Sequence, residues 1–168
     1  MNRINKILAL GVFFVAIGGW LLYPARGVPI LAYHQVAAAD DIYNIDPRDF
    51  EAQMSYLAAN GYTAISLADM FAAGRGEKAL PAKPVIITFD DGYEDNYLTA
   101  LPIMEKYGMR GTVFVIASLV GQPEYLNWDE IRDLRDHRTE IGSHTLTIWR
   151  WIPCRRRIWN ANLPSPGQ

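Results

Sequence analysis

The stretch "VIITFDDGYEDNY", residues 85–97, decides how this chain folds and where its function is to be sought. Its first five residues form a mainly apolar run, which is typical of a strand buried on both faces of a parallel sheet. The run stops at two adjacent carboxylates, Asp90 and Asp91, followed by Gly92. Because neighbouring side chains of an extended strand point in opposite directions, both carboxylates reach one cleft only if the chain turns at the glycine. The alternative is a plain solvent-exposed turn, where Asp and Gly are common.

Apolar, strand-like runs alternate with helix-like segments along most of the chain. Local signals mark the helix ends: Asp46 and Pro47 begin the first helix, and Gly61 stops it. We expect helices at 47–60, 67–74, 97–107 and 127–138, and strands at 28–34, 62–66, 85–89 and 111–118, with a fifth strand ending within 140–145. This alternation predicts a parallel α/β sheet with helices on both faces.

Three of the predicted strands end in side chains that can carry chemistry, namely Tyr33-His34, Asp90-Asp91 and Ser143-His144. In parallel α/β folds the functional groups collect at the carboxyl ends of the strands. We therefore expect one cleft, in which one of the two carboxylates could hold a metal ion while the other stays free as a base, and in which His144 could meet Asp91 as a second ligand. A single histidine is more often a structural hydrogen-bonding group, so the prediction depends on the three strand ends together. The acidic residues of 90–96 lack the alternating spacing of a calcium loop.

These residues resemble a known enzyme family. "TFDDGY" (88–93) is similar to the first motif of the polysaccharide deacetylases, the NodB-homology or carbohydrate esterase family 4 group, and "SHT" (143–145) to the front half of the second. "YHxV" (33–36) resembles the poly-N-acetylglucosamine deacetylase branch, and the resemblance covers 28–147. It implies a partial, distorted (β/α) barrel and metal-dependent hydrolytic N-deacetylation of an N-acetylglucosamine-type polysaccharide of the cell envelope or cell exterior.

The resemblance also implies roles for single residues. Asp90 corresponds to the general base, and Asp91 to a ligand of a divalent metal, commonly zinc, with nickel, cobalt or iron as alternatives. His144 corresponds to the first of two histidine ligands four residues apart, a spacing that places both rings on one face of a helical turn. His34 and Tyr93 are expected to line the site or to contact the substrate.

The pattern breaks at the second histidine, because Ile148 stands four residues after His144. Residues 148–168 hold three of the five tryptophans, the only cysteine and four arginines, but no acidic residue. One added nucleotide before codon 148 allows a reading that begins His-Leu-Glu-Met-Asp, so we expect a one-nucleotide deletion or a sequencing error there. Genuine divergence is the alternative.

We accordingly divide the chain into an anchor (1–26), the N-terminal part of a deacetylase domain (27–147) and an aberrant tail (148–168). A complete barrel of this type needs roughly 200–250 residues, and the family's later motifs have no counterpart here. We expect this truncated chain to be inactive, and a non-catalytic carbohydrate-binding or structural remnant is the alternative. A glycoside hydrolase is disfavoured, because adjacent aspartates are poorly placed to flank a sugar at a separation of at least about 5 Å.

The N-terminus predicts a membrane anchor. Arg3 and Lys6 precede an uncharged run of 19 residues, 7–25, which Arg26 closes. As a helix the run would be about 28 Å long, close to the roughly 30 Å of a bilayer's hydrocarbon core. Bulky residues near its end disfavour a cleaved signal peptide, and the lack of a polar face disfavours a core helix. We expect the domain on the extracytoplasmic side of the cell membrane. The formal charge of −2 disfavours a nucleic-acid partner.

Overall fold

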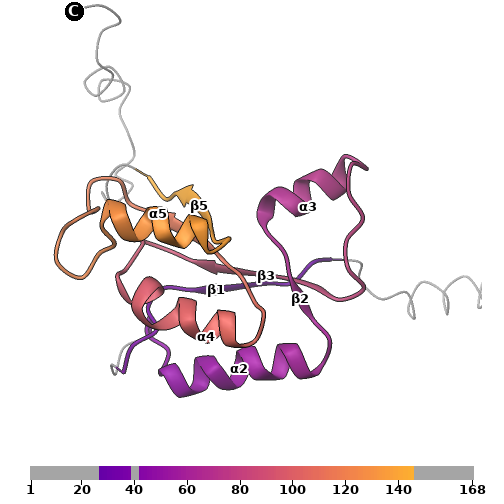
Figure 1. The fold of residues 1–168 in the computed structure, drawn as a ribbon, viewed down its shortest axis with the longest axis horizontal. Coiled ribbons are helices and arrows are strands. Elements are labelled where there is room, and N and C mark those ends of the chain that lie inside the picture. The colour runs from indigo at the N-terminus through magenta and orange to yellow at the C-terminus, as the bar shows by residue number, and fades with distance from the viewer. Residues whose placement is uncertain (1–26, 39–41, 146–168) are drawn as a thin grey trace, which may run out of the picture.

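The computed structural model of the protein describes residues 27–38 and 42–145 (Figure 1). The predicted anchor and the predicted aberrant tail lie outside these residues. Within them, no helix is both long and apolar enough to cross a membrane.

A parallel sheet forms the centre of the described domain, as the sequence predicts. Its strands are β1 (Ile30–Tyr33), β2 (Thr63–Ala64), β3 (Pro84–Phe89), β4 (Thr112–Val115) and β5 (Glu140–Ser143). The strand order is β1-β3-β4-β5, and β2 also pairs with β3. Strand β3 pairs with both β2 and β4 because these two strands pair with different parts of it. Strand β2 pairs with the amino end of β3 through Thr63↔Pro84, and β4 pairs with its carboxyl end through Phe89↔Val113.

The predicted helices are all confirmed, with small shifts at their ends. They are α2 (Pro47–Ala59), α3 (Leu67–Gly74), α4 (Leu101–Lys106) and α5 (Trp128–Asp136), with a π-helical turn, η1 (Asn96–Ala100), leading into α4. The start of α4 at Leu101 fits Pro102, which lies in the first turn of the helix. Backbone N–H groups in the first turn have no partner within the helix, so proline can occupy this position without the loss of a helical hydrogen bond. Ser66 and Asn127 begin α3 and α5 with capping boxes.

The hydrophobic core gathers around β3. Residues 85–89 of this strand are all buried, as expected for a strand covered on both faces. Helix α2 presents Phe50, Met54 and Leu57 to the core at helical spacing. Helices α2 and α4 lie side by side along the sheet (Figure 1), and Glu51 of α2 accepts a hydrogen bond from the Tyr107 hydroxyl that follows α4.

One contact that joins distant parts of the chain fixes β5 against α3. The Glu140 carboxylate accepts hydrogen bonds from the backbone N–H groups of Leu67 (2.8 Å) and Ala68 (3.2 Å). It also accepts one from the buried Thr112 hydroxyl (3.0 Å). These two N–H groups belong to the first turn of α3, which has no intrahelical partner for them. A strand residue therefore caps a helix that lies more than seventy residues away in the sequence.

Candidate active site

The turn after β3 has an unusual backbone that serves both carboxylates. The N–H of Asp90 still donates to the Tyr33 carbonyl (2.9 Å), which continues the pairing of β3 with β1. Asp91 and Gly92 then adopt left-handed conformations, with φ of 71° and 76°. A Cβ on Gly92 would lie 2.9 Å from Val115 Cγ1 and 3.1 Å from Val115 Cα. Glycine is therefore required for the dihedral angle and for the close approach to β4.

His144 reaches the same place from β5. Its N–H donates to the Val115 carbonyl (2.9 Å), so the residue continues the pairing of β5 with β4. Its Nε2 lies 3.8 Å from an oxygen of Asp90 and 3.9 Å from an oxygen of Asp91. Both distances exceed a hydrogen bond, so the imidazole nitrogen and the two carboxylates enclose a small space. The structure thus brings together Asp90, Asp91 and His144.

The pair of Asp91 and His144 fits a shared metal ion. Two ligand atoms that each lie about 2.1 Å from one zinc ion stand at most about 4.2 Å apart, and the separation here is 3.9 Å. A carboxylate oxygen with an imidazole nitrogen is also a donor set that zinc accepts. Within the described ranges no group of three or more His, Cys, Asp or Glu side chains is arranged to hold a metal ion.

A shallow cavity of about 570 Å³ opens beside the pair, and it is lined by Asp90, Phe114, Ser143, His144 and Thr145. The Phe114 ring lies against Gly142, where an added Cβ would meet the ring at 2.5 Å. An apolar wall opposite carboxylate and imidazole groups suits a small substituent with one polar end. Phe114 is a site residue that the sequence analysis missed, because it lies inside a continuous apolar strand that gives no sign of which side chain faces the cleft.

His34 and Tyr93 do not line this cavity. The His34 ring contacts Tyr43, with 5.2 Å between ring centroids. The Tyr93 ring stacks on the Tyr125 ring, with 4.9 Å between their centroids. Partial burial raises the pKa of the Tyr93 hydroxyl, and the hydrogen bond with Tyr125 raises it further. A site-lining role for His34 and Tyr93 stays a prediction.

Asp95 and Asn96 tie the β1 end to the turn after β3. Asn96 Nδ2 donates to the His34 carbonyl and to the Asp95 carboxylate, both at 2.9 Å. The Asp95 carboxylate also accepts the N–H of Val36, although burial has the larger effect and raises the Asp95 pKa. The last two polar residues of the opening stretch therefore position the loop that carries His34.

Comparison with known proteins agrees with this geometry. Residues 77–158 match the family model of the polysaccharide deacetylases. YxkH of Bacillus subtilis (strain 168), a polysaccharide deacetylase by name, is 36% identical over 123 residues, which are 73% of this chain and 43% of YxkH. The poly-beta-1,6-N-acetyl-D-glucosamine N-deacetylase of Escherichia coli (strain K12) is 30% identical over 142 residues, covering 73% of this chain and 21% of that protein.

Among solved structures, IcaB from Ammonifex degensii matches with a TM-score of 0.66 and 31% identity, over 73% of this chain and 54% of IcaB. The chain thus spans about half or less of the length of these relatives. The parallel sheet with its "TFDDGY" turn defines a polysaccharide deacetylase domain of the NodB type. Members of this family are hydrolases that act on N-acetyl amide bonds.

Proposed function

We propose that this domain is built for hydrolytic N-deacetylation of an N-acetylglucosamine-type polysaccharide of the cell envelope. The observation that carries the proposal is the placement of the Asp90 and Asp91 carboxylates beside His144 Nε2, at the carboxyl ends of β3 and β5. The name of the Escherichia coli relative supports an N-acetylglucosamine polymer as the substrate class, and the name of the Bacillus subtilis relative supports a polysaccharide. In the proposed location, the cell membrane holds residues 7–25 and the domain lies on the extracytoplasmic side.

The residues divide the chemistry between them. Asp91 and His144 would hold the divalent metal, most simply zinc, which when bound supplies a water of lowered pKa and stabilises an oxyanion. Asp90, at 3.8 Å from His144 Nε2, is near enough to take the proton of an attacking water. Phe114 would pack against the acetyl methyl group, and Ser143 lines the same cavity.

Ile148 offers no lone pair where the family resemblance implies the second histidine ligand. We therefore propose that this chain binds zinc weakly and has no measurable turnover. Loss of a group that merely supports a metal ligand typically costs about 10–100-fold in affinity or activity, and loss of a ligand should cost more. In a zinc titration of the full chain, Asp91→Asn should abolish binding, Ile148→His should strengthen it, and Asp129→Asn, an exposed carboxylate on α5, should leave it unchanged.

The activity test is acetate release from N-acetylglucosamine oligomers, with zinc, nickel or cobalt supplied. We expect none from the unmodified chain and clear release once the reading frame before codon 148 is restored. Release by the unmodified chain would show that two protein ligands suffice. A frame-restored chain that binds the oligomers but releases no acetate would favour a carbohydrate-binding protein over an enzyme.

A further inference from the structure

The amino end of the sheet is basic. The amino-end loops lead into the strands and comprise residues 60–62, 75–83, 107–111 and 137–139. They contain five cations and one anion, a net charge of 5 − 1 = +4 for the loops alone, from Arg75, Lys78, Lys83, Arg110, Arg138 and Glu77. Asp69 of α3 pairs with two of these cations, Lys78 and Arg110, and leaves Lys83 and Arg138 to carry the positive charge of the surface. A cation thus shortly precedes each of β3, β4 and β5.

The carboxyl end of the sheet, which carries the candidate site, has the opposite charge. The carboxyl-end loops follow the strands, and their described parts are 34–38, 42–46, 65–66, 90–95 and 116–127. These described parts contain six acidic residues and neither Lys nor Arg, from Asp46, Asp90, Asp91, Glu94, Asp95 and Glu124. A chain whose formal charge is only −2 is therefore polarised along its strands.

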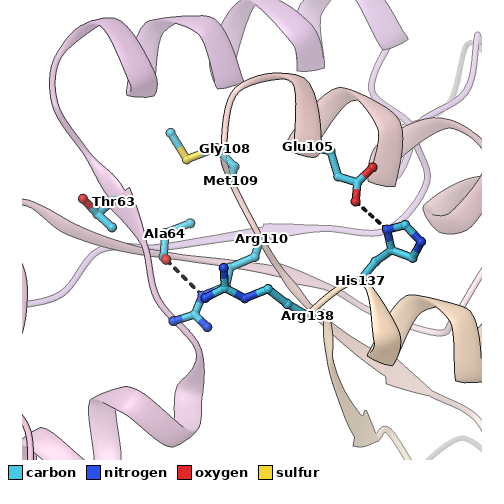
Figure 2. Close-up of a pocket in the computed structure, with 8 residues that line it drawn as sticks. All are labelled: Thr63, Ala64, Glu105, Gly108, Met109, Arg110, His137 and Arg138. Carbon is cyan, nitrogen blue, oxygen red and sulfur yellow. Dashed lines mark hydrogen bonds and ion pairs between the residues drawn. The ribbon is translucent and has the colours of Figure 1, made fainter.

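A cavity of about 420 Å³ opens within the basic end, and Figure 2 shows Arg110 and Arg138 entering it from neighbouring loops. Arg110 Nε donates to the Ala64 carbonyl (3.2 Å) and its Nη2 pairs with the Asp69 carboxylate, and these two contacts hold its guanidinium at the cavity wall. The acidic residue of the lining, Glu105, is engaged by the His137 ring at 2.6 Å. Arg138 is exposed and has a φ of 66°, a conformation that favours glycine. An arginine thus occupies a position at which the backbone conformation favours glycine.

The chain before the described domain also enters at this end. In the sequence, only Gly27, Val28 and Pro29 stand between Arg26 and the first residue of β1. From this juxtaposition we infer that the amino-end loops dock on anionic phospholipid headgroups, with a headgroup phosphate entering the Arg110–Arg138 cavity. The inference rests on the proposed membrane location of the domain.

Docking of this kind sets the orientation of the enzyme. Anionic headgroups attract the basic amino-end loops and repel the acidic carboxyl-end loops. The six residues of β3 then hold the candidate site about 20 Å further from the bilayer. The cavity beside Asp90 and His144 therefore opens away from the membrane, toward polymer outside the cell.

The test is a surface footprint of the full chain in vesicles. The chain is reconstituted in neutral phosphatidylcholine vesicles and in vesicles with one quarter phosphatidylglycerol, and hydrogen exchange is measured in low and high salt. We expect the amino-end loops to be protected only in the anionic vesicles at low salt, because a Debye length of about 3 Å in 1 M salt screens the attraction. Segments 90–95 and 116–127 should exchange equally in all samples.

Charge variants identify the surface. Lys83→Gln with Arg138→Gln should lower the docked-to-free ratio roughly 25-fold, at about fivefold for each cation near an anionic surface. The matched control, Arg48→Gln with Arg132→Gln, removes the same charge from exposed positions on α2 and α5 and should change nothing. Circular dichroism serves as the control that both double variants are folded.

Three results would overturn the inference: equal protection in both vesicle types, protection of the carboxyl-end loops instead, or the same protection by soluble polyphosphate without vesicles. The last would assign the cavity to a soluble polyanion. Sedimentation with the neutral vesicles tests the anchor separately, and acetate release tests the enzyme. If the anchor or the enzyme activity fails its own test, the comparison between neutral and anionic vesicles still tests the docking surface.

Discussion

Gly92→Ala should destabilise the domain and disturb the proposed metal site together. A non-glycine residue in the left-handed conformation costs roughly 1–2 kcal/mol. The added Cβ would lie 2.9 Å from Val115 Cγ1 and 3.1 Å from Val115 Cα, so backbone as well as side chain must shift. Overpacking of this kind typically costs about 1–3 kcal/mol. Lower entropy of the unfolded chain offsets about 0.4–1 kcal/mol, and we expect a net loss of roughly 2–4 kcal/mol.

The matched control is Gly108→Ala. Gly108 also has a left-handed backbone, with φ of 66°, but nothing lies within 4 Å of its added Cβ. Its loss should be about 1 kcal/mol, so the difference between the variants measures the close approach to β4. Urea unfolding followed by circular dichroism gives both values, and zinc titration should show weaker binding for Gly92→Ala alone. Equal destabilisation of the two variants would refute the packing argument, and unchanged zinc binding would separate the turn from the metal site.

Three further changes test the electrostatics of the fold. Glu140→Ala should lower the free energy of unfolding by about 2–4 kcal/mol, because hydrogen bonds to charged groups contribute about 1.5–3 kcal/mol each and water replaces some of them; Glu140→Gln should lose about half as much. The Asp69 pKa is lowered from 3.8 to about 2, first by its hydrogen bond with Lys78. Its stabilising contribution is therefore complete above pH 4 and is lost as the pH falls toward 2, and Asp69→Asn should remove that part of the acid transition. The hydrogen bond with Glu105 raises the His137 pKa above 6.5. The stabilisation that this pair gives the fold is therefore complete below pH 6.5 and is lost at higher pH, and His137→Gln should abolish this pH dependence.

Much of the fold could be predicted from the sequence because its signals are local. The apolar run of β3 and the Asp46–Pro47 start of α2 each depend on a few neighbouring residues. The grouping of Asp90, Asp91 and His144 could also be predicted, because parallel strands bring their carboxyl ends to one edge.

The contacts that the sequence analysis missed join distant residues. Glu140 caps α3 across 73 positions, and Asn96 reaches the His34 carbonyl across 62. Phe114 faces the cavity only because Gly142 on the neighbouring strand leaves room for its ring. Neither a periodicity nor a motif identifies such partners before the strands are aligned.

The sheet itself answers why a buried strand ends in two adjacent carboxylates. Asp90 remains in the β1 ladder, and Asp91 departs from it into a left-handed turn, so two neighbours that would diverge on a strand approach the same imidazole nitrogen. Val115 of β4 contacts the turn at Gly92 and accepts the His144 N–H, so one strand end holds both sides of the pair. The proposed ligand pair, Asp91 and His144, is fixed by sheet contacts and does not depend on the residue four positions after His144. The expected effect of Ile148→His is therefore a third ligand added to a preformed pair, with zinc affinity rising while the free energy of unfolding without metal stays the same.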